Sequence, residues 1–403
     1  MHVVVLGAGV VGVTTAYYLA ENGHTVTVVE RADAVASGAS GGNGGQLSYS
    51  FTDAMASPAL LAKLPKVIAG LDPAFRVCPP ITSLPVRWGL SFLRQSSAHS
   101  SRANTLAILQ MALRSSSLMA ELRSRIPLEF AFRKAGKLVL LNNQPEKDAA
   151  EKLCRVKRQI GCDVRVVDFE QANDIEPALS HIQCQCVGAV YSADDELGDA
   201  LLFTEQLSRW LAKHRNVEFK FNTEVHRIST EKGSIASVET DSGTLKPDAL
   251  VVCLGAWSSR FLQPLGIRAD VYPVRGYSVT LPPGDKPNSV SVSDLSNKMV
   301  YSRLGDRIRI AGFADIVGYS VHRDKARIRT LLDTARGFAP KIADYNETSR
   351  GEWGGFRPVT PDSRPLVGPT TINGLYLNTG HGMFGWTLAC ASANEVAEAL
   401  KVA

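Results

Sequence analysis

The chain has 403 residues, of which 45% are hydrophobic and 21% are charged, and its net charge is +5. This composition excludes a disordered or fibrous chain and allows two globular domains. The mild, dispersed charge argues against nucleic-acid binding, and no apolar run reaches the roughly 18 residues of a membrane span. Seven cysteines without paired C-x-x-C motifs predict reduced thiols and no metal site. Because no cleavable leader precedes the first strand, we expect a cytoplasmic protein.

The first thirty residues carry the strongest pattern. An apolar run at 3–6 predicts a buried parallel strand, and Gly7, Gly9 and Gly12 follow it with G-x-G-x-x-G spacing before a helix. Gly7 allows a tight turn, Gly9 lets the backbone approach a pyrophosphate, and Gly12 lets the helix pack on the sheet. The helix amino end then binds the pyrophosphate through free N–H groups.

A second strand is expected at 25–29, and it ends on Glu30. An acidic residue about 20 positions after the glycines accepts hydrogen bonds from a ribose hydroxyl. The complete strand–helix–strand pattern therefore predicts dinucleotide binding. The motif alone does not separate FAD from NAD.

Small residues dominate the segment 36–48. They are typical either of a flexible linker or of a loop whose backbone approaches a flat or phosphorylated ligand. We favour the ligand loop, because the segment begins six residues after Glu30.

Residues 51–100 look loop-like and rich in proline. Within them, 80–94 combines apolar and basic residues, which is typical either of a helix packed on its own domain or of a peripheral membrane contact. Further along the chain, apolar periodicity predicts helices at 102–126, 146–160, 199–213 and 322–338. Strands are predicted at 217–221, 224–229, 235–240, 244–245, 249–253, 271–281, 299–303, 307–313 and 375–378.

A chain that returns to the nucleotide site near 225–257 and again near its end indicates a large ligand, and FAD suits this better than NAD. The small residues at 379–387 open a closing helix that runs to 402. Its positive amino end would stabilise the negative charge that develops at the flavin N1–C2=O locus on reduction.

Five segments together resemble the D-amino-acid dehydrogenase small-subunit family, within the wider group of glycine oxidase, sarcosine oxidase and D-amino-acid oxidase flavoproteins. In chain order they are VVVLGAGVVGVTTAYYLAENGHTVTVVER, DELGDALLFT, VYPVRGYSVT, GGFRPVTPD and NTGHGMFGWTLACAS. The resemblance implies an α/β fold with a Rossmann-type FAD-binding domain (1–80, 187–257 and 345–403). It also implies an α+β substrate domain on an antiparallel sheet (81–186 and 258–344).

The same resemblance implies which residues contact non-covalent FAD. Covalent attachment is not expected, because Cys390 lies inside the last helix rather than in the motif that sarcosine oxidases use. The expected FAD contacts are Gly7, Gly9, Val10, Val11, Gly12, Glu30, Arg31, Ala39, Ser40, Gly44, Gly45, Gln46, Leu47, Val225, Gly255, Ala256, Trp257, Gly355, Gly380, His381, Gly382, Met383, Phe384, Gly385 and Thr387.

Arg357 falls where glycine oxidases and their relatives bind the substrate carboxylate, and a planar guanidinium matches a carboxylate in bidentate fashion. Tyr301 resembles a substrate-site tyrosine of the group, although a strand aromatic at this position also has an ordinary structural explanation. Glycine oxidase has an arginine where this chain has Met383, a difference that favours the dehydrogenase branch.

The resemblance implies oxidative deamination of D-amino acids to 2-oxo acids and ammonia, with hydride transfer from Cα to flavin N5. Electrons would pass to a quinone or another acceptor that is not oxygen, at the inner face of the cell membrane, with 80–94 as the candidate contact. Two alternatives stay open. One is oxidation of another small amine, such as glycine, sarcosine, hydroxy-D-proline or other secondary amines, and the other is a non-catalytic flavin-binding protein.

Overall fold

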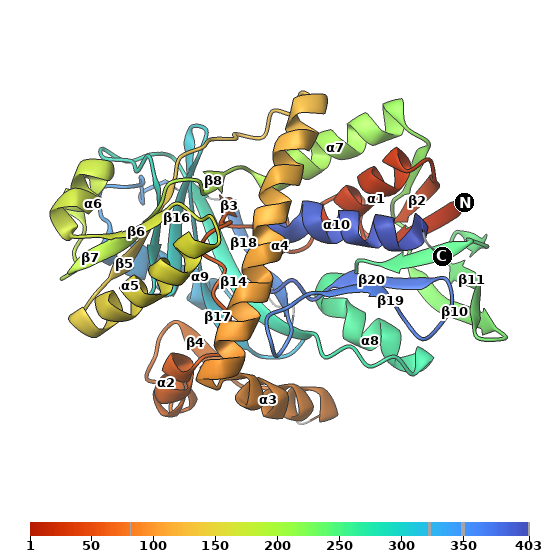
Figure 1. Cartoon of the computed structure of the whole chain (residues 1–403), viewed down its shortest axis with the longest axis horizontal. Helices are drawn as coiled ribbons and strands as arrows, with labels where there is room; N and C mark the ends of the chain where they lie inside the picture. Colours follow the sequence, from red (N-terminus) through yellow and green to blue (C-terminus); the bar gives the residue numbers. More distant parts are fainter. Residues whose placement is uncertain (81, 321–323, 348–350, 402–403) are drawn as a thin grey trace.

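The computed structural model describes residues 1–80, 82–320, 324–347 and 351–401. Two large sheets form the two ends of an elongated molecule, and the long helix α4 (Ala98–Arg125) crosses between them (Figure 1). Residues from both sheets line one cavity, so the arrangement of the sheets decides which side chains meet there.

The first sheet carries the predicted nucleotide-binding unit. Its strands pair in parallel except at β19, which is antiparallel to β20. Continuous Val and Leu runs suit strands that are covered on both faces. In spatial order the strands are β19 (Leu366–Pro369), β20 (Leu375–Thr379), β13 (Ala249–Val252), β1 (His2–Leu6), β2 (Thr25–Val29) and β9 (Val217–Lys220).

The second sheet is mainly antiparallel, with parallel pairing only between β15 and β5 and between β4 and β17 among the described strands. In spatial order it contains β18 (Gly351–Val359), β14 (Tyr272–Leu281), β17 (Arg307–Ile316), β16 (Met299–Leu304), β15 (Ser291–Asp294), β5 (Lys137–Leu141), β7 (Gly188–Ser192) and β6 (Val164–Val167), while β4 (Phe75–Val77) joins β17.

Two small sheets and a set of helices complete the fold. The small sheets are β10 (Val225–Glu231), β11 (Ser234–Thr240) and β12 (Gly243–Leu245), and β3 (Gln46–Leu47) with β8 (Glu196–Leu197). The other α-helices are α1 (Val10–Glu21), α2 (Pro58–Ile68), α3 (Ser83–Gln95), α5 (Gln144–Gln159), α6 (Phe169–Ile175), α7 (Ala200–His214), α8 (Ser258–Leu262), α9 (Lys325–Phe338) and α10 (Gly385–Lys401).

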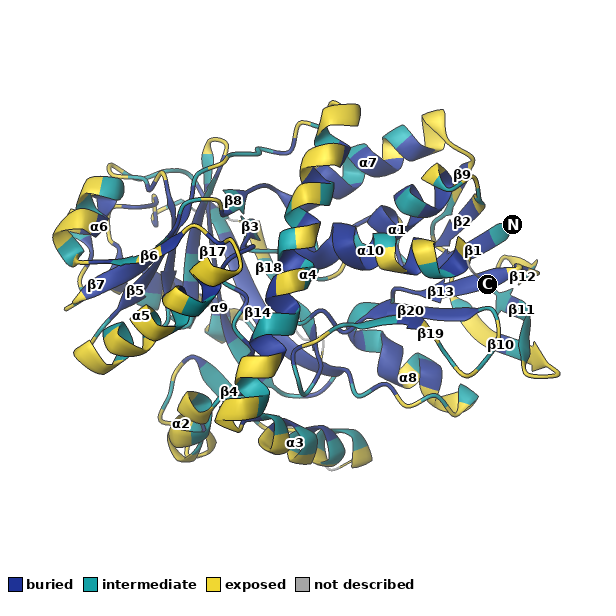
Figure 2. Ribbon diagram, viewed as in Figure 1, coloured by how far each residue is buried: buried dark blue, intermediate teal, exposed yellow. Residues whose placement is uncertain are grey.

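Burial follows this layering (Figure 2). On one face of the first sheet, Val5 packs in a core with Leu207 of α7 and Leu388 of α10. On the opposite face, Leu6 packs with Val238 of the β10–β12 sheet. A third core lies where α9 covers the second sheet. The other face of the second sheet is therefore left to border the cavity.

Some expectations need correction. The stretch 51–100 was expected to be loop-like, but α2 and α3 form within it; Ser57 caps α2, and Pro65 lies inside that helix. Cys184 and Cys186 form a disulfide, so the prediction that every thiol is reduced is wrong. The expected domain boundaries stay a prediction, although β4, β7 and β18, which fall in the expected FAD-binding segments, pair in the second sheet.

Helix α1 lies so close to the turn after β1 that position 12 has no room for a side chain. A Cβ at Gly12 would lie 1.9 Å from the carbonyl oxygen of Gly7. We predict that Gly12→Ala destabilises the fold by about 1–3 kcal/mol, the usual cost of overpacking, as measured by denaturant unfolding. Gly337→Ala in α9 is the matched control, because a Cβ there has nothing within 4 Å and alanine favours a helix. Equal losses in both variants would contradict the close-packing argument.

Candidate active site

The cavity between the two sheets has a volume of about 1560 Å³. Small-molecule sites usually have about 300–1,000 Å³, so this one suits a ligand as large as a dinucleotide together with a substrate. One part is bordered by the amino ends of α1 and α10 and by β18, and another extends under α2, α4 and α5.

The amino end of α1 is open to an anion. Its N-cap is Gly9, which has no capping side chain, and the first turn of the helix holds no acidic residue. Ser40 approaches from the small-residue loop and accepts a hydrogen bond of 2.9 Å from Val10 N. The helix dipole and its unsatisfied N–H groups favour a phosphate group at such an end.

Glu30 is fixed beside this helix end. Its Oε2 accepts a hydrogen bond from Ala8 N at 2.9 Å, and its Oε1 accepts one from Ala32 N at 3.0 Å. The carboxylate thus lies at the end of β2, where it lines the cavity. The next residue, Arg31, places its guanidinium carbon 4.5 Å from the ring centroid of Trp257, which brings the 255–257 segment to the same place.

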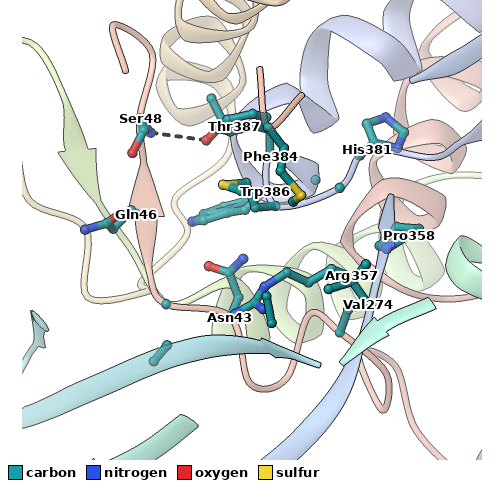
Figure 3. Close-up of a pocket in the computed structure, with 18 of the residues that line it drawn as sticks. Asn43, Gln46, Ser48, Val274, Arg357, Pro358, His381, Phe384, Trp386 and Thr387 are labelled. Carbon is teal, nitrogen blue, oxygen red and sulfur yellow. Dashed lines mark hydrogen bonds between the residues drawn. The ribbon is translucent and has the colours of Figure 1, made fainter. Parts of the chain in front are cut away.

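The amino end of α10 lies beside that of α1 and also borders the cavity (Figure 3), because a Cβ at Gly385 would lie 4.0 Å from Val11 Cγ2. Ser48 N donates a hydrogen bond of 3.1 Å to Thr387 Oγ1, which ties β3 to the first turn of α10. Gly382 N donates to Pro358 O at 2.8 Å, so the end of β18 lies beside the residues that precede the helix.

His381 is buried, and its Nε2 lies 2.9 Å from Ser392 Oγ. Burial lowers the pKa of His381 to about 3. The imidazole is therefore neutral near pH 7 and suits a hydrogen-bonding contact better than a role as a charged acid.

Arg357 is the strongest candidate for a substrate contact. It belongs to β18, and its side chain passes over Gly276 of β14, where a Cβ would lie only 2.4 Å from the guanidinium carbon. Nη1 donates to Phe313 O at 2.5 Å, and Nη2 lies 3.5 Å from Gly312 O, both on β17. Phe313 has a left-handed φ of 63°, and the β14–β17 ladder is irregular there, which frees its carbonyl oxygen for Arg357.

In the described part of the chain, the charge of the Arg357 guanidinium is not balanced by a contacting carboxylate, unlike that of most cations in protein interiors. Among the described residues no carboxylate oxygen lies within 4.0 Å of its guanidinium. Burial lowers its pKa to about 10, and the distant Asp315 raises the pKa only in part. A partly buried cation without a contacting anion is unfavourable, so an anion that enters the cavity would be stabilised here.

Most of the predicted site residues do line this cavity. Those that line it are Gly7, Gly9, Val10, Val11, Glu30, Arg31, Ala39, Ser40, Gly44, Gln46, Val225, Gly255, Ala256, Trp257, Gly355, Arg357, His381, Gly382, Met383, Phe384, Gly385 and Thr387. Four predicted residues are absent from the lining: Gly12, Gly45, Leu47 and Gly380. Cys390 is buried in α10 and is also absent from the lining.

Tyr301 is not where the prediction put it. Its ring stacks on Phe338 of α9 with the centroids 5.5 Å apart, and its hydroxyl lies 4.0 Å from Met299 Sδ. Tyr301 is absent from the cavity lining, which its neighbour Val300 and the preceding Met299 join. Successive residues of a strand point to opposite faces, so Tyr301 faces α9, and we do not retain it as a site residue.

Sequence reasoning also missed several lining residues. Asn43, Ser48, Lys137 and Trp353 line the cavity, and Gly276 makes room for Arg357. Gly276 lies within the motif VYPVRGYSVT, whose single glycine was the available signal. Lys137 comes from a strand with no motif of its own.

Comparison with known proteins identifies the family of the chain. The DAO family, described as FAD-dependent oxidoreductases, matches residues 2–399. The chain belongs to this family. It is 39% identical to a D-amino acid dehydrogenase of Dechloromonas aromatica and 37% identical to one of Vibrio cholerae. These matches cover 99% of this chain and 96% and 95% of the two relatives.

Solved structures support the same fold. Glycine oxidase from Geobacillus kaustophilus matches with a TM-score of 0.78 at 22% identity, covering 99% of this chain and 94% of that one. Glycine oxidase from Bacillus cereus matches with a TM-score of 0.75 at 20% identity, covering 100% and 95%. An FAD-bound L-alpha-glycerophosphate oxidase from Mycoplasma pneumoniae matches with a TM-score of 0.70 at 17% identity, covering 99% and 94%.

The residues that line the cavity of this FAD-dependent oxidoreductase match the chemical groups of FAD. The amino end of α1, where Gly9 has no capping side chain, suits the pyrophosphate. Glu30 suits a ribose, and the amino end of α10 suits the electron-rich end of a flavin. When bound, FAD supplies a two-electron acceptor. In the part of the chain that the structure covers, no helix has the length and apolarity to span a bilayer, and no group of three or more His, Cys, Asp or Glu is arranged to hold a metal ion.

The two backbone hydrogen bonds that Glu30 accepts give a test of the nucleotide site. In Glu30→Gln one side-chain oxygen is replaced by an NH₂ group, which cannot accept from Ala8 N or Ala32 N. We expect FAD affinity to fall by about 1.5–3 kcal/mol, the value of a hydrogen bond to a charged group. Fluorescence titration of the apoprotein with FAD measures this, with Glu218→Gln on the exposed part of β9 as the control. Unchanged affinity in Glu30→Gln would remove this residue from the site.

Proposed function

We propose that this FAD-dependent oxidoreductase oxidises D-amino acids to 2-oxo acids and ammonia. The observation that carries the proposal is Arg357, a half-buried guanidinium that borders the cavity and has no contacting carboxylate among the described residues. An α-carboxylate supplies the missing charge and matches the guanidinium geometry. The curated relatives named D-amino acid dehydrogenase support the choice of substrate class.

In this proposal Arg357 positions the substrate rather than reacting with it. Its guanidinium is held by the carbonyl oxygens of Phe313 and Gly312, which fixes where the carboxylate binds. When bound, FAD accepts the hydride that leaves Cα. The imine formed from the substrate is then hydrolysed by water. We assign no general base, because the neutral amine form of the substrate needs none and His381 stays uncharged.

Anaerobic mixing tests the reaction class. We expect D-alanine to bleach the flavin absorbance and L-alanine to leave it unchanged. Bleaching only by glycine, sarcosine or hydroxy-D-proline would instead establish oxidation of another small amine. Bound FAD that none of these compounds reduces would favour a non-catalytic flavin-binding protein.

Removing the guanidinium charge tests the carboxylate site. We predict that Arg357→Met raises KM for D-alanine and lowers kcat/KM by about 2–5 kcal/mol, as for other lost buried charge partners. Gly276→Ala should act in the same direction, because its Cβ displaces the guanidinium. The control is Arg329→Met, on an exposed position of α9. Steady-state dye reduction measures all three, and an unchanged KM in Arg357→Met would refute the assignment.

We further propose that the electrons pass to a quinone or similar acceptor at a membrane surface. In this proposal α3 is the helix that contacts the membrane. One face of α3 packs inward, with Trp88 Nε1 donating to Val359 O at 2.8 Å. The other face exposes Val86, Leu90 and Leu93 by 60%, 54% and 45%. An exposed apolar stripe flanked by a basic residue such as Arg94 is typical of a helix that lies in a membrane interface.

Vesicle binding tests the membrane contact. Each leucine buried in lipid contributes about 1.5–3 kcal/mol, so Leu90→Ser with Leu93→Ser should lower binding to vesicles containing phosphatidylglycerol by tenfold or more. Leu202→Ser, an exposed leucine on α7, is the control and should bind like the unsubstituted protein. Cosedimentation gives the readout. Equal binding by all three proteins, or none by the unsubstituted protein, would refute a contact through α3.

A further inference from the structure

Two lysines from neighbouring elements reach the same part of the cavity. Lys137 begins β5 and Lys157 lies on α5, and the two residues are only 4% and 3% exposed. Their ammonium nitrogens lie 4.7 Å and 5.2 Å from the ring centroid of Phe51. Both are therefore cations held in largely apolar surroundings, where a charge is expensive unless something compensates it.

Their partners differ. Lys157 Nζ lies 2.7 Å from Asp53 Oδ1, an ordinary buried ion pair. Lys137 Nζ instead donates to two neutral oxygens, Gln46 Oε1 at 3.1 Å and Ser48 Oγ at 2.8 Å. Among the described residues no carboxylate oxygen lies within 4.0 Å of it.

Two carboxylates, Asp195 and Asp53, act on Lys137 from more than 4.0 Å away, and Asp195 has the larger effect. Asp195 Oδ1 accepts a hydrogen bond from Ser50 N at 2.8 Å, and its Oδ2 has no partner in the described part of the chain. Burial lowers the pKa of Lys137 to about 8 in spite of these carboxylates. The ammonium on the cavity wall is thus only partly compensated, by carboxylates that do not contact it.

Lys137 is connected to the expected flavin contacts on both sides. Gln46 belongs to the loop predicted to run along the isoalloxazine, and its amide nitrogen donates to Ser291. Ser48 N donates to Thr387 Oγ1 at the amino end of α10 (Figure 3). Two positive groups, the ammonium and this helix end, therefore converge on one part of the cavity.

Lys137 does not bind the same substrate carboxylate as Arg357. Arg357 is on β18 and Lys137 is on β5, and β14, β17, β16 and β15 lie between them. Strand spacings of about 4.8 Å separate the two strands by roughly 24 Å along the sheet, much more than a small amino acid spans. The anion that Lys137 faces is thus a different one from the carboxylate assigned to Arg357.

We propose that Lys137 is the cation that compensates the negative charge of the reduced flavin, and that it holds Gln46 and Ser48 against the cofactor. Reduction adds two electrons and one proton to the flavin, which leaves one additional negative charge on the ring. A fixed positive group in a dry site stabilises that charge without reorganisation. The proposal rests on FAD binding, which the family establishes, and not on which amino acid is oxidised.

Sulfite is a probe of this charge that requires no turnover. Its sulfur bonds to flavin N5, no group leaves, and negative charge passes to the pyrimidine ring, as it does on reduction. We predict that Lys137→Met holoenzyme binds sulfite at least tenfold more weakly and that its bound FAD has a lower reduction potential. Lys137→Arg should restore both within about threefold, since it keeps the charge.

Lys157→Met is the matched control, because it removes a buried lysine from the same region while Asp53 remains 32% exposed. It should bind sulfite within about twofold of the unsubstituted protein. Sulfite affinity unchanged in Lys137→Met, or lowered equally in Lys157→Met, would overturn the proposal.

A measurement on the unsubstituted protein guards against variants that do not fold. Its bound FAD should have a higher reduction potential than free FAD, and a lower potential would also overturn the proposal. Failure of the D-amino acid assignment would leave sulfite affinity and potential unaffected, so the two proposals fail separately.

Discussion

The close packing of α1 on the turn after β1 is the constraint on which the site depends. Gly12 leaves no space for a Cβ beside Gly7 O, and the buried Thr15 of the same helix is bonded to Asn378 of β20 at 2.9 Å. The helix is thereby fixed against the first sheet, and its amino end opens into the cavity. Because the N–H groups there cannot bond within the helix, the fold itself creates the anion site that an FAD pyrophosphate requires.

The second sheet supplies the charges that the first lacks. The Arg357 side chain crosses β14 over a glycine and donates to carbonyl oxygens of β17. Lys137 lies several strands further along the sheet and donates to Gln46 and Ser48. Neither side chain contacts a carboxylate among the described residues. By contrast, Arg327 of α9 makes a bidentate pair with Asp315 outside the cavity, with N–O distances of 2.6 Å and 3.1 Å. The unpaired cations thus face the cavity, where ligand charge is expected, and this distribution underlies both functional proposals.

Helix α3 shows how one element can carry two kinds of surface. The ring centroids of Trp88 and Phe92 lie 4.9 Å apart, and these side chains pack the helix on its own domain. The expectation that 80–94 packs on its own domain therefore applies to one face of α3. The outward residues Val86, Leu90 and Leu93 recur at i, i+4 and i+7 and form a single stripe. The nearby α2 lines the cavity through Leu60 and Lys63 (Figure 1).

Local spacing in the sequence was enough to predict the β1–α1–β2 unit, its glycines and Glu30, because one strand, one helix and one turn fix that geometry among adjacent residues. Tertiary structure alone decided the rest. The strand β16 begins with the apolar run Met299–Tyr301, so no polar alternation indicated that Val300 rather than Tyr301 borders the cavity. Likewise, Lys137 and Gln46 are 91 residues apart, and no local pattern brings them together. The pairing of β5 with β15 places Lys137 beside Ser291, and Gln46 reaches both residues from β3 in another sheet.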